Sequence, residues 1–255
     1  MKDLVNVLIP ILDTNLTPNQ SKILSHCLSV LGQYPIIFIS YEGADMAWVE
    51  EYKPNADIVS FPKEYFQSRQ TLAKLFLMQD FYDRFSWTDF LLIHELNTWI
   101  VRDELHYWCK QGYDYLKAPP LTQNDPKYPK STALLLGLNA EQKGIVAEGF
   151  NENGLYLCHV QRMIKALQKK SKTAYQYRHN ESIPNRDSVF WEVEANRLWP
   201  SLRKPTEPVR AYFSKSLINS TFTSEDKNKT IPFAYTGINS NNIDNLPFEE
   251  VKRKK

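Results

Sequence analysis

Signatures of several common enzyme classes are missing from this sequence of 255 residues. It contains no Walker-type phosphate loop and no Gly-rich dinucleotide fingerprint, and no serine stands in a nucleophile elbow. The five histidines are scattered, and no two of them have the spacing of a zinc-binding pair. These absences exclude most of the enzyme classes that a short motif reveals.

Cysteines and long apolar runs are also scarce. The three cysteines, Cys27, Cys109 and Cys158, lie far apart and share no metal-like spacing. An odd number without an obvious pairing fits a reducing compartment. No stretch reaches the roughly 18 apolar residues that a membrane span requires, and the first residues lead into a short apolar strand rather than a signal peptide. We therefore expect a cytoplasmic protein.

The charge is nearly balanced. Lys and Arg number 31 against 29 Asp and Glu, a net charge of +2, so no global field favours a nucleic-acid partner. Basic residues gather only at 252–255 and at 169–172. Such runs are usually solvated chain. The functional alternative is a weak attraction to an anionic membrane surface, which would place the protein peripherally on its cytosolic face.

Short apolar runs alternate with helical patterns along the first half of the chain. This order predicts βαβ units and hence an α/β fold, with a mostly parallel, Rossmann-like central sheet flanked by helices. The length suits a single domain, which we place at residues 1–238, followed by a loose polar and basic tail at 239–255. The predicted strands are 4–12, 35–40, 57–61, the run beginning at 89, and 112–119.

Helix signals are strongest near the amino terminus. Thr17, Pro18 and Gln20 form an N-cap, a proline at the first helical position and a capping-box partner. A second helical pattern runs from Phe66 to Tyr82. Beyond residue 120 the patterns weaken. There we expect an ambiguous apolar run at 133–138, a helix at about 160–168, an exposed linker at 169–184, and a helix beginning at Asp187.

Residues 89–105 form the stretch around which the rest is organised. An apolar run ends in a polar cluster, His94, Glu95 and Asn97, before a second short apolar patch. Ligands of open α/β sheets bind at the carboxyl ends of strands, so these side chains are candidates for a site. The alternative is that they only cap the turn after the strand.

Several segments resemble a family of bacterial and fungal glycosyltransferase-like proteins of unknown function with a GT-A fold. The resemblance covers about nine-tenths of the chain and is strongest between residues 64 and 119. The segments that carry it are Phe81-Tyr82-Asp83-Arg84-Phe85, Arg102-Asp103-Glu104-Leu105, Trp108-Cys109 and Gly112-Tyr113-Asp114-Tyr115, with weaker matches at Asn153-Gly154-Leu155, Val189-Phe190-Trp191 and Pro232-Phe233-Ala234.

The resemblance implies a metal-binding triplet after the fourth strand. The family has a Gln-Leu-Asp-like triplet there, whose Asp helps to hold Mn or Mg against the donor diphosphate, whereas this chain has Glu95-Leu96-Asn97. Divalent ions prefer carboxylate oxygens to a neutral amide. Glu95 is therefore the candidate metal ligand, and both Glu95 and Asn97 are candidate donor-binding residues.

Three other motifs of the family are altered as well. The Asn-Gly-Gly-like turn reads Glu152-Asn153-Gly154, and we take Asn153 and Gly154 as donor-binding candidates. The Glu-Asp pair before Val-Phe-Trp reads Asp187-Ser188. The late Pro-Phe-x-x-His motif ends at Thr236, so the histidine that often completes the metal site is missing.

These changes leave three alternatives for the site. The protein binds its donor without a metal, or Glu95 supplies a rearranged metal site, or activity has been lost. Metal-free transfer needs another cation to stabilise the leaving diphosphate, and Arg69, Lys74 and Arg210 are the candidates.

The remaining site residues follow from the resemblance. Asp187 is the predicted catalytic base that deprotonates an acceptor hydroxyl, with a helix N-cap as its structural alternative. Pro10 and Ile11, and at the next strand end Tyr41 and Glu42, are the residues expected to hold the nucleobase. Ordinary strand-to-loop packing is the alternative for all four.

The resemblance implies an enzyme, a hexosyltransferase-like glycosyltransferase. It would move a sugar from a nucleotide-sugar donor to a glycan or lipid-linked acceptor in cell-surface polysaccharide assembly, without a nucleic-acid partner. The alternative is a catalytically inactive glycosyltransferase-like binding or scaffolding module, which the altered triplet and the missing histidine favour.

Overall fold

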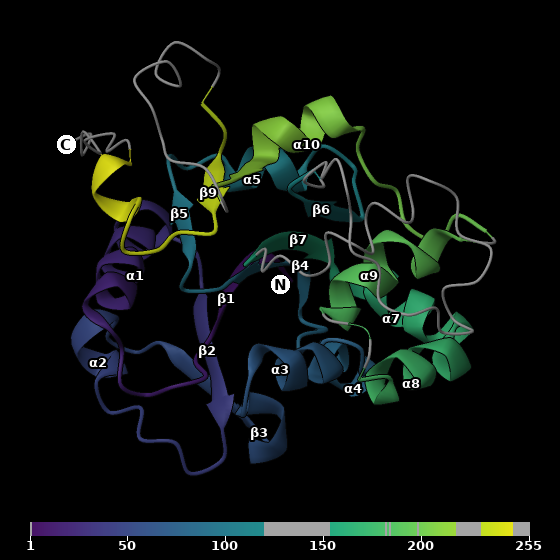
Figure 1. The fold of residues 1–255 in the computed structure, drawn as a ribbon, viewed down its shortest axis with the longest axis horizontal. Helices are drawn as coiled ribbons and strands as arrows, with labels where there is room; N and C mark the ends of the chain where they lie inside the picture. Colours follow the sequence, from purple (N-terminus) through teal and green to yellow (C-terminus); the bar gives the residue numbers. More distant parts are fainter. Residues whose placement is uncertain are drawn as a thin grey trace.

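The central feature of the fold is a six-stranded sheet in the order β3-β2-β1-β4-β7-β6 (Figure 1). The computed structural model describes residues 2–119, 154–181, 183, 185–197, 199–217 and 231–246. The predicted run at 133–138 and the basic residues at 252–255 lie outside this part. The strands of the sheet are β1 (Asp3–Pro10), β2 (Ile36–Tyr41), β3 (Asp57–Phe61), β4 (Thr88–His94), β6 (Tyr115–Lys117) and β7 (Leu155–His159).

The sheet is mostly parallel, as predicted. Strands β1 to β4 pair in parallel, while β7 lies antiparallel to both β4 and β6. The β7 strand was not predicted, because its five residues follow a glycine and lead directly into a helix, leaving too short an apolar run to recognise. Its insertion separates β6 from β4 and makes the sheet mixed.

Helices cover both faces of this sheet. Along β1, Val5, Val7 and Ile9 pack with one set of helices, while Leu8 packs with the other, as expected when successive side chains alternate across a strand. The first set comprises α1 (Pro18–Leu31), α2 (Val49–Tyr52), α5 (Leu105–Cys109) and α10 (Glu207–Phe213). The second set comprises α3 (Arg69–Leu75), α4 (Gln79–Asp83), α7 (Val160–Lys169), α8 (Ser171–His179) and α9 (Arg186–Glu192).

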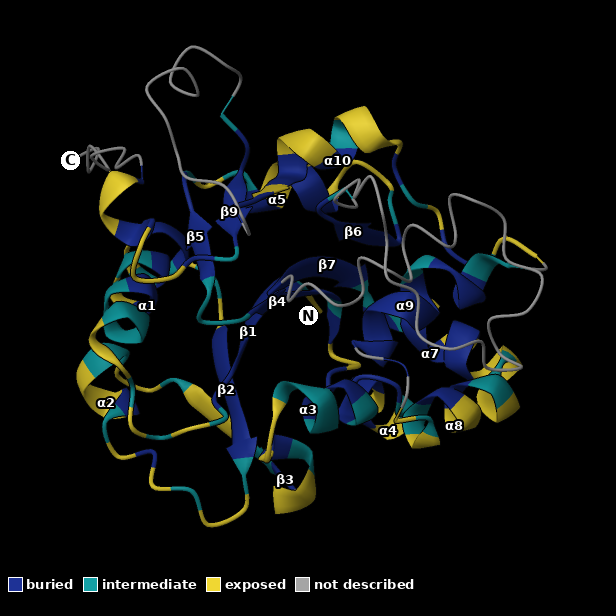
Figure 2. Ribbon diagram, viewed as in Figure 1, coloured by how far each residue is buried: buried dark blue, intermediate teal, exposed yellow. Residues whose placement is uncertain are grey.

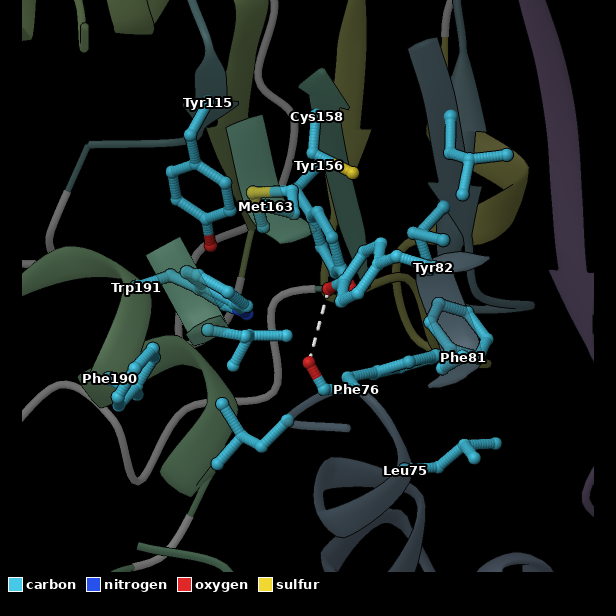
Figure 3. Close-up of a cluster of buried hydrophobic side chains, with 14 of the residues drawn as sticks. Leu75, Phe76, Phe81, Tyr82, Tyr115, Tyr156, Cys158, Met163, Phe190 and Trp191 are labelled. Atoms are coloured by element: carbon cyan, nitrogen blue, oxygen red, sulfur yellow. Dashed lines mark hydrogen bonds between the residues drawn. The ribbon is translucent and has the colours of Figure 1, made fainter. Parts of the chain in front are cut away.

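The second set of helices encloses an aromatic core (Figure 3). Tyr82 donates a hydrogen bond from its hydroxyl to the carbonyl of Phe76 at 3.1 Å, and its ring meets Trp191 edge-on at 6.0 Å. Tyr115 and Tyr156 line the sheet side of the same core. This core joins α3 and α4, which are neighbours in the sequence, to the distant α9 in one layer.

A second, three-stranded sheet in the order β5-β9-β8 lies beside the first. Its strands are β5 (Thr98–Ile100), β8 (Ser214–Ser216) and β9 (Ala234–Thr236). Because β4 ends at His94 and β5 begins at Thr98, the stretch predicted as one strand end is the connection between two sheets. Trp99 and Tyr235 are buried in a small core of their own. Strands β5 and β9, which carry them, are coloured as buried in Figure 2.

The first residues of the predicted tail pack onto this second sheet. Ile243 and Leu246 are buried in the same small core, and a 3₁₀ turn spans Ile243–Asn245. The remaining residues, 247–255, lie outside the described part of the chain. The division of the chain at residue 238 therefore stays a prediction.

Two predictions for the helices were wrong. The supposed linker at 169–184 contains α8, which buries Ala174 and Tyr177 against the second set of helices. Only these two apolar contacts face inward, so the segment has a polar composition despite being helical. The helical pattern from Phe66 to Tyr82 does not form one helix, because it is divided into a 3₁₀ turn, Lys63–Phe66, followed by α3 and α4.

The local signals at α1 were confirmed. Thr17 is the N-cap, Pro18 begins the helix, and Gln20 completes the capping box. None of the helices in the described part of the chain combines the length and apolar character that crossing a membrane requires. All three cysteines are buried and unpaired.

Candidate functional site

A cavity of about 300 Å³ opens at the carboxyl ends of β1 and β4. The chain runs from β1 outward through β2 and β3, then returns to place β4 on the other side of β1. Open α/β sheets bind ligands at such a reversal of strand order. The cavity is lined by Pro10, Ile11, Leu12, Asp13, Leu16, Gln20, Arg69, Leu72, Glu95, Leu96 and Asn97.

Arg69 is the positively charged residue of the cavity wall. It is the first residue of α3, whose start is set by a capping box between Ser68 and Thr71. Its Nε lies 2.8 Å from Glu95 Oε1, and its terminal nitrogens donate to both carboxylate oxygens of Asp187, at 2.9 and 3.4 Å. The guanidinium therefore joins α3, the end of β4 and α9.

The two carboxylates hold Arg69 differently. The Asp187 side chain is 1% exposed and accepts two directed hydrogen bonds from Arg69, whereas that of Glu95 is 13% exposed and its contact with Nε lacks the geometry of a hydrogen bond. Burial by itself lowers the pKa of Arg69, but Asp187 and then Glu95 raise it, and the net pKa lies above its ordinary value. Arg69 therefore stays charged.

Gly154 is necessary because Asn97 packs against its backbone. A Cβ atom at Gly154 would lie 1.8 Å from Asn97 Oδ1 and 2.8 Å from Glu95 Cβ. The Gly154 carbonyl also accepts a hydrogen bond from the Glu95 backbone N–H at 2.7 Å. The backbone of Gly154 thus packs directly against Glu95 and Asn97, which leaves no room for a side chain at position 154.

Part of the predicted donor site is assembled in the structure. Pro10, Ile11, Glu95 and Asn97 line the cavity together, and Gly154 lies directly behind Asn97. Asn153 lies outside the described residues. The roles of these residues in binding stay predictions.

The predicted residues at the end of β2 lie elsewhere. Tyr41 packs against Phe66 with Lys63 over its ring, and Glu42 is exposed. Neither is among the residues that line the cavity. The packing alternative therefore describes the environment of Tyr41.

Of the three candidate cations, only Arg69 reaches the cavity. Arg210 is buried and donates to Glu192 and to the carbonyls of Lys117 and Ala118, which ties α10 to β6. Lys74 lies 3.9 Å from the exposed Glu181. Neither is among the lining residues.

The N-cap alternative for Asp187 was wrong. Asn185, with a positive φ of 43°, is the N-cap residue of α9, and Asp187 is its second helical residue. The Asp187 carboxylate turns toward Arg69, so α9 presents it to the cavity side of the fold without placing it on the cavity wall.

The residues around Glu95 do not fit a divalent ion. A cation bound at Glu95 Oε1 would meet the guanidinium of Arg69, which already lies 2.8 Å from this oxygen. The other two motif positions carry neutral groups, Asn97 and the buried Thr236, which pairs with Thr98 across β5 and β9. Within the described ranges, no three His, Cys, Asp or Glu side chains gather in a metal-binding group.

The sequence patterns did not reveal several of the lining residues. Leu12 and Asp13 lie two and three residues beyond the end of β1, so the strand-end rule that selected Glu95 and Asn97 would have found them. Gln20 was assigned only to the capping box, and Leu16, Leu72 and Leu96 have no polar signal. Apolar wall residues of this kind can be recognised only once the chain is folded.

His94, the last residue of β4, is fully buried, and neither ring nitrogen has a hydrogen-bond partner within the described part of the chain. Burial lowers its pKa to about 4, against a smaller opposing effect of nearby backbone. The folded state therefore binds fewer protons than the unfolded state between about pH 6.5 and pH 4.

We expect the titration of His94 to lower the free energy of unfolding by about 3 kcal/mol as the pH drops from about 6.5 to about 4. Urea unfolding at several pH values measures it. The His94→Gln variant should flatten the slope, whereas His106→Gln, at an exposed position of α5, should leave it unchanged. A wild-type slope in His94→Gln would contradict this origin.

The fold is similar to those of solved glycosyltransferases. The galactosyltransferase LgtC, in complex with donor and acceptor sugar analogues, matches with a TM-score of 0.53 and 11% identity, over 92% of this chain and 87% of that one. At this identity the similarity shows the fold alone. The protein therefore has the GT-A glycosyltransferase fold that its sequence predicts.

Two further structures align at lower TM-scores. One is a glycosyltransferase involved in the glycosylation of the major capsid of PBCV-1, with a TM-score of 0.49 and 12% identity over 91% of this chain and 92% of that one. The other is apo-form glycosyltransferase GlyE of Streptococcus pneumoniae TIGR4, with a TM-score of 0.47 and 10% identity over 94% of this chain and 55% of that one. No curated protein matches the sequence. Residues 55–236 match a family described as "Protein of unknown function (DUF5672)". The chain belongs to this family.

Proposed function

We propose that this protein is a glycosyltransferase that moves a sugar from a nucleotide-diphosphate donor to a glycan or lipid-linked acceptor. The observation that carries the proposal is the cavity at the carboxyl ends of β1 and β4 in a chain with the GT-A fold. The setting we propose is cell-surface polysaccharide assembly, with the enzyme at the cytosolic side of the membrane.

The cavity wall combines apolar and charged side chains, which supports this assignment. Ile11, Leu12 and Leu16 provide apolar surface near the end of β1, suited to the flat face of a nucleobase. Arg69, with Glu95, lies at the end of β4 and offers charged and hydrogen-bonding groups to the polar part of a donor.

We propose that Asp187 positions Arg69. Its sequence-predicted role was that of the base for the acceptor hydroxyl. Both of its oxygens accept hydrogen bonds from Arg69, and only 1% of its side chain is exposed. An acceptor hydroxyl could reach this carboxylate only after Arg69 had moved.

Calorimetry with a panel of nucleotide-diphosphate sugars, with and without Mn²⁺, tests the proposed function. A second assay follows release of the nucleoside diphosphate in the presence of candidate acceptors. Failure of every donor to bind in both conditions would refute the transferase assignment. Donor binding without turnover would instead favour the non-catalytic module, the candidate that the neutral residues Asn97 and Thr236 support.

We expect Asp187→Asn to raise KM for the donor by about tenfold or more while changing kcat less. The NH₂ group of the amide cannot accept a hydrogen bond from Arg69, and the lost orientation of the guanidinium outweighs the smaller repulsion of the donor. The pH profile of kcat should keep its shape. The control is Asp114→Asn, which removes another buried carboxylate, one that pairs with Arg162 and Arg203 rather than with Arg69. If kcat fell by about 10²–10⁴-fold and its low-pH limb disappeared, Asp187 would be the base.

A further inference from the structure

Arg69 pairs with two carboxylates in different ways. Asp187 is buried behind the guanidinium and accepts two hydrogen bonds, whereas Glu95 lines the cavity and makes an ion pair without hydrogen-bond geometry. A ligand that entered the cavity would first meet the side of Arg69 that faces Glu95.

We propose that Arg69 is an anion-binding group and that Glu95 is its resident counter-ion, which yields its place to a phosphate oxygen of the ligand without a divalent ion. Given the proposed function, the ligand is the diphosphate of the donor. The inference extends that function by naming the cation of the site.

The guanidinium is suited to this exchange. It carries five N–H donors in a planar arrangement that matches carboxylate and phosphate oxygens equally well. Asp187 holds the terminal nitrogens at 2.9 and 3.4 Å, which fixes the orientation of the plane. Because an anion would replace Glu95, Arg69 would remain paired on both sides, and no isolated buried charge would form.

Glu95 is the more accessible of the two carboxylates. Its side chain is 13% exposed and lies on the cavity wall, where an entering ligand reaches it, and its backbone N–H is bonded to Gly154 independently of the carboxylate. Asp187, at 1% exposure, has no comparable path to water. The exchange therefore affects one carboxylate and leaves the other in place.

The proposal and a metal site predict opposite effects on anion binding when the charge of Glu95 is removed. Among the described residues, Asp13 and Glu95 line the cavity and Asp187 lies behind it, whereas Arg69 is the one cation of the wall. Each carboxylate repels an incoming anion, so removing the charge of Glu95 should favour the anion. If Glu95 instead held a metal ion that bound the diphosphate, removing its charge would weaken binding.

The test is calorimetric binding of inorganic pyrophosphate and of a nucleoside diphosphate to the full chain in EDTA. We expect both anions to bind to the wild type, and Glu95→Gln to tighten binding by at least about fivefold. Arg69→Lys should weaken it, because a lysine keeps the charge but loses the planar set of donors. The control Glu51→Gln, with the same chemical change on exposed α2, should have no effect.

The proposal would be overturned if the anions bound only after Mn²⁺ was added, if Glu95→Gln weakened binding, or if neither anion bound in EDTA. Should Glu95→Gln fail to fold, the comparison of wild type in EDTA and in Mn²⁺ still decides. Donor binding that required Mn²⁺ would refute this inference and leave the transferase assignment intact. Failure of all donors in both conditions would refute the assignment itself.

Discussion

Replacing Arg69 with methionine is expected to lower the free energy of unfolding by about 3–5 kcal/mol, the usual cost of removing one partner from a buried ion pair. Asp187 and Glu95, with side chains 1% and 13% exposed, would lose the cation between them. Equilibrium unfolding in urea measures the change. Because methionine has a similar length and is apolar, little of the effect should come from a cavity.

The control is Lys2→Met, which breaks an ion pair of the same 2.8 Å separation at the surface, where both side chains are more than a third exposed. We expect it to cost less than about 1 kcal/mol. In the double variant with Asp187→Asn, the loss should be at least about 1 kcal/mol smaller than the sum of the single losses. Additive losses would contradict the direct coupling.

Replacing Gly154 with alanine should lower the free energy of unfolding by about 1–3 kcal/mol through overpacking, and should also weaken ligand binding in the cavity. The added Cβ would lie 1.8 Å from Asn97 Oδ1, so the amide must leave its place. The φ of Gly154 lies outside the left-handed region, so alanine meets no backbone penalty there and the clash accounts for the effect. Urea unfolding and donor calorimetry measure the two consequences.

The companion variants are Asn97→Ala and the double variant. Removing the amide of Asn97 relieves the contact at 1.8 Å and leaves the milder one, 2.8 Å to Glu95 Cβ. Alanine at 154 should therefore cost less stability in the Asn97→Ala background than in the wild type. An equal cost in both backgrounds would show that the contact with Asn97 is not responsible.

The first half of the fold could be predicted because its signals are local. The capping box at Thr17 lies within four residues, and the buried strands β1 and β2 are largely apolar runs bounded by turn residues. The place of the cavity followed from the same runs, since the carboxyl ends of parallel strands meet at one edge. Glu95 and Asn97 were found in this way, whereas Pro10 was assigned from the family resemblance.

The rest depends on contacts between distant residues. The pairing of β7 between β4 and β6 is set by the whole sheet, and α8 is stabilised by tertiary packing of only two buried residues. The bond from Arg69 to Asp187 spans 118 positions of sequence. No periodicity records such a pair, so Arg69 could be proposed as a cation but not placed.

The connection between the two sheets gives the site a mechanical property. Only Glu95, Leu96 and Asn97 separate β4 from β5, and three residues reach at most about 10 Å. The Asn97 carbonyl is further tied to the second sheet by the Ile238 N–H at 2.8 Å. A shift of the three-stranded sheet relative to the larger one would therefore displace the cavity wall. A ligand bound to Glu95 or Asn97 would in turn restrict the movement of one sheet against the other.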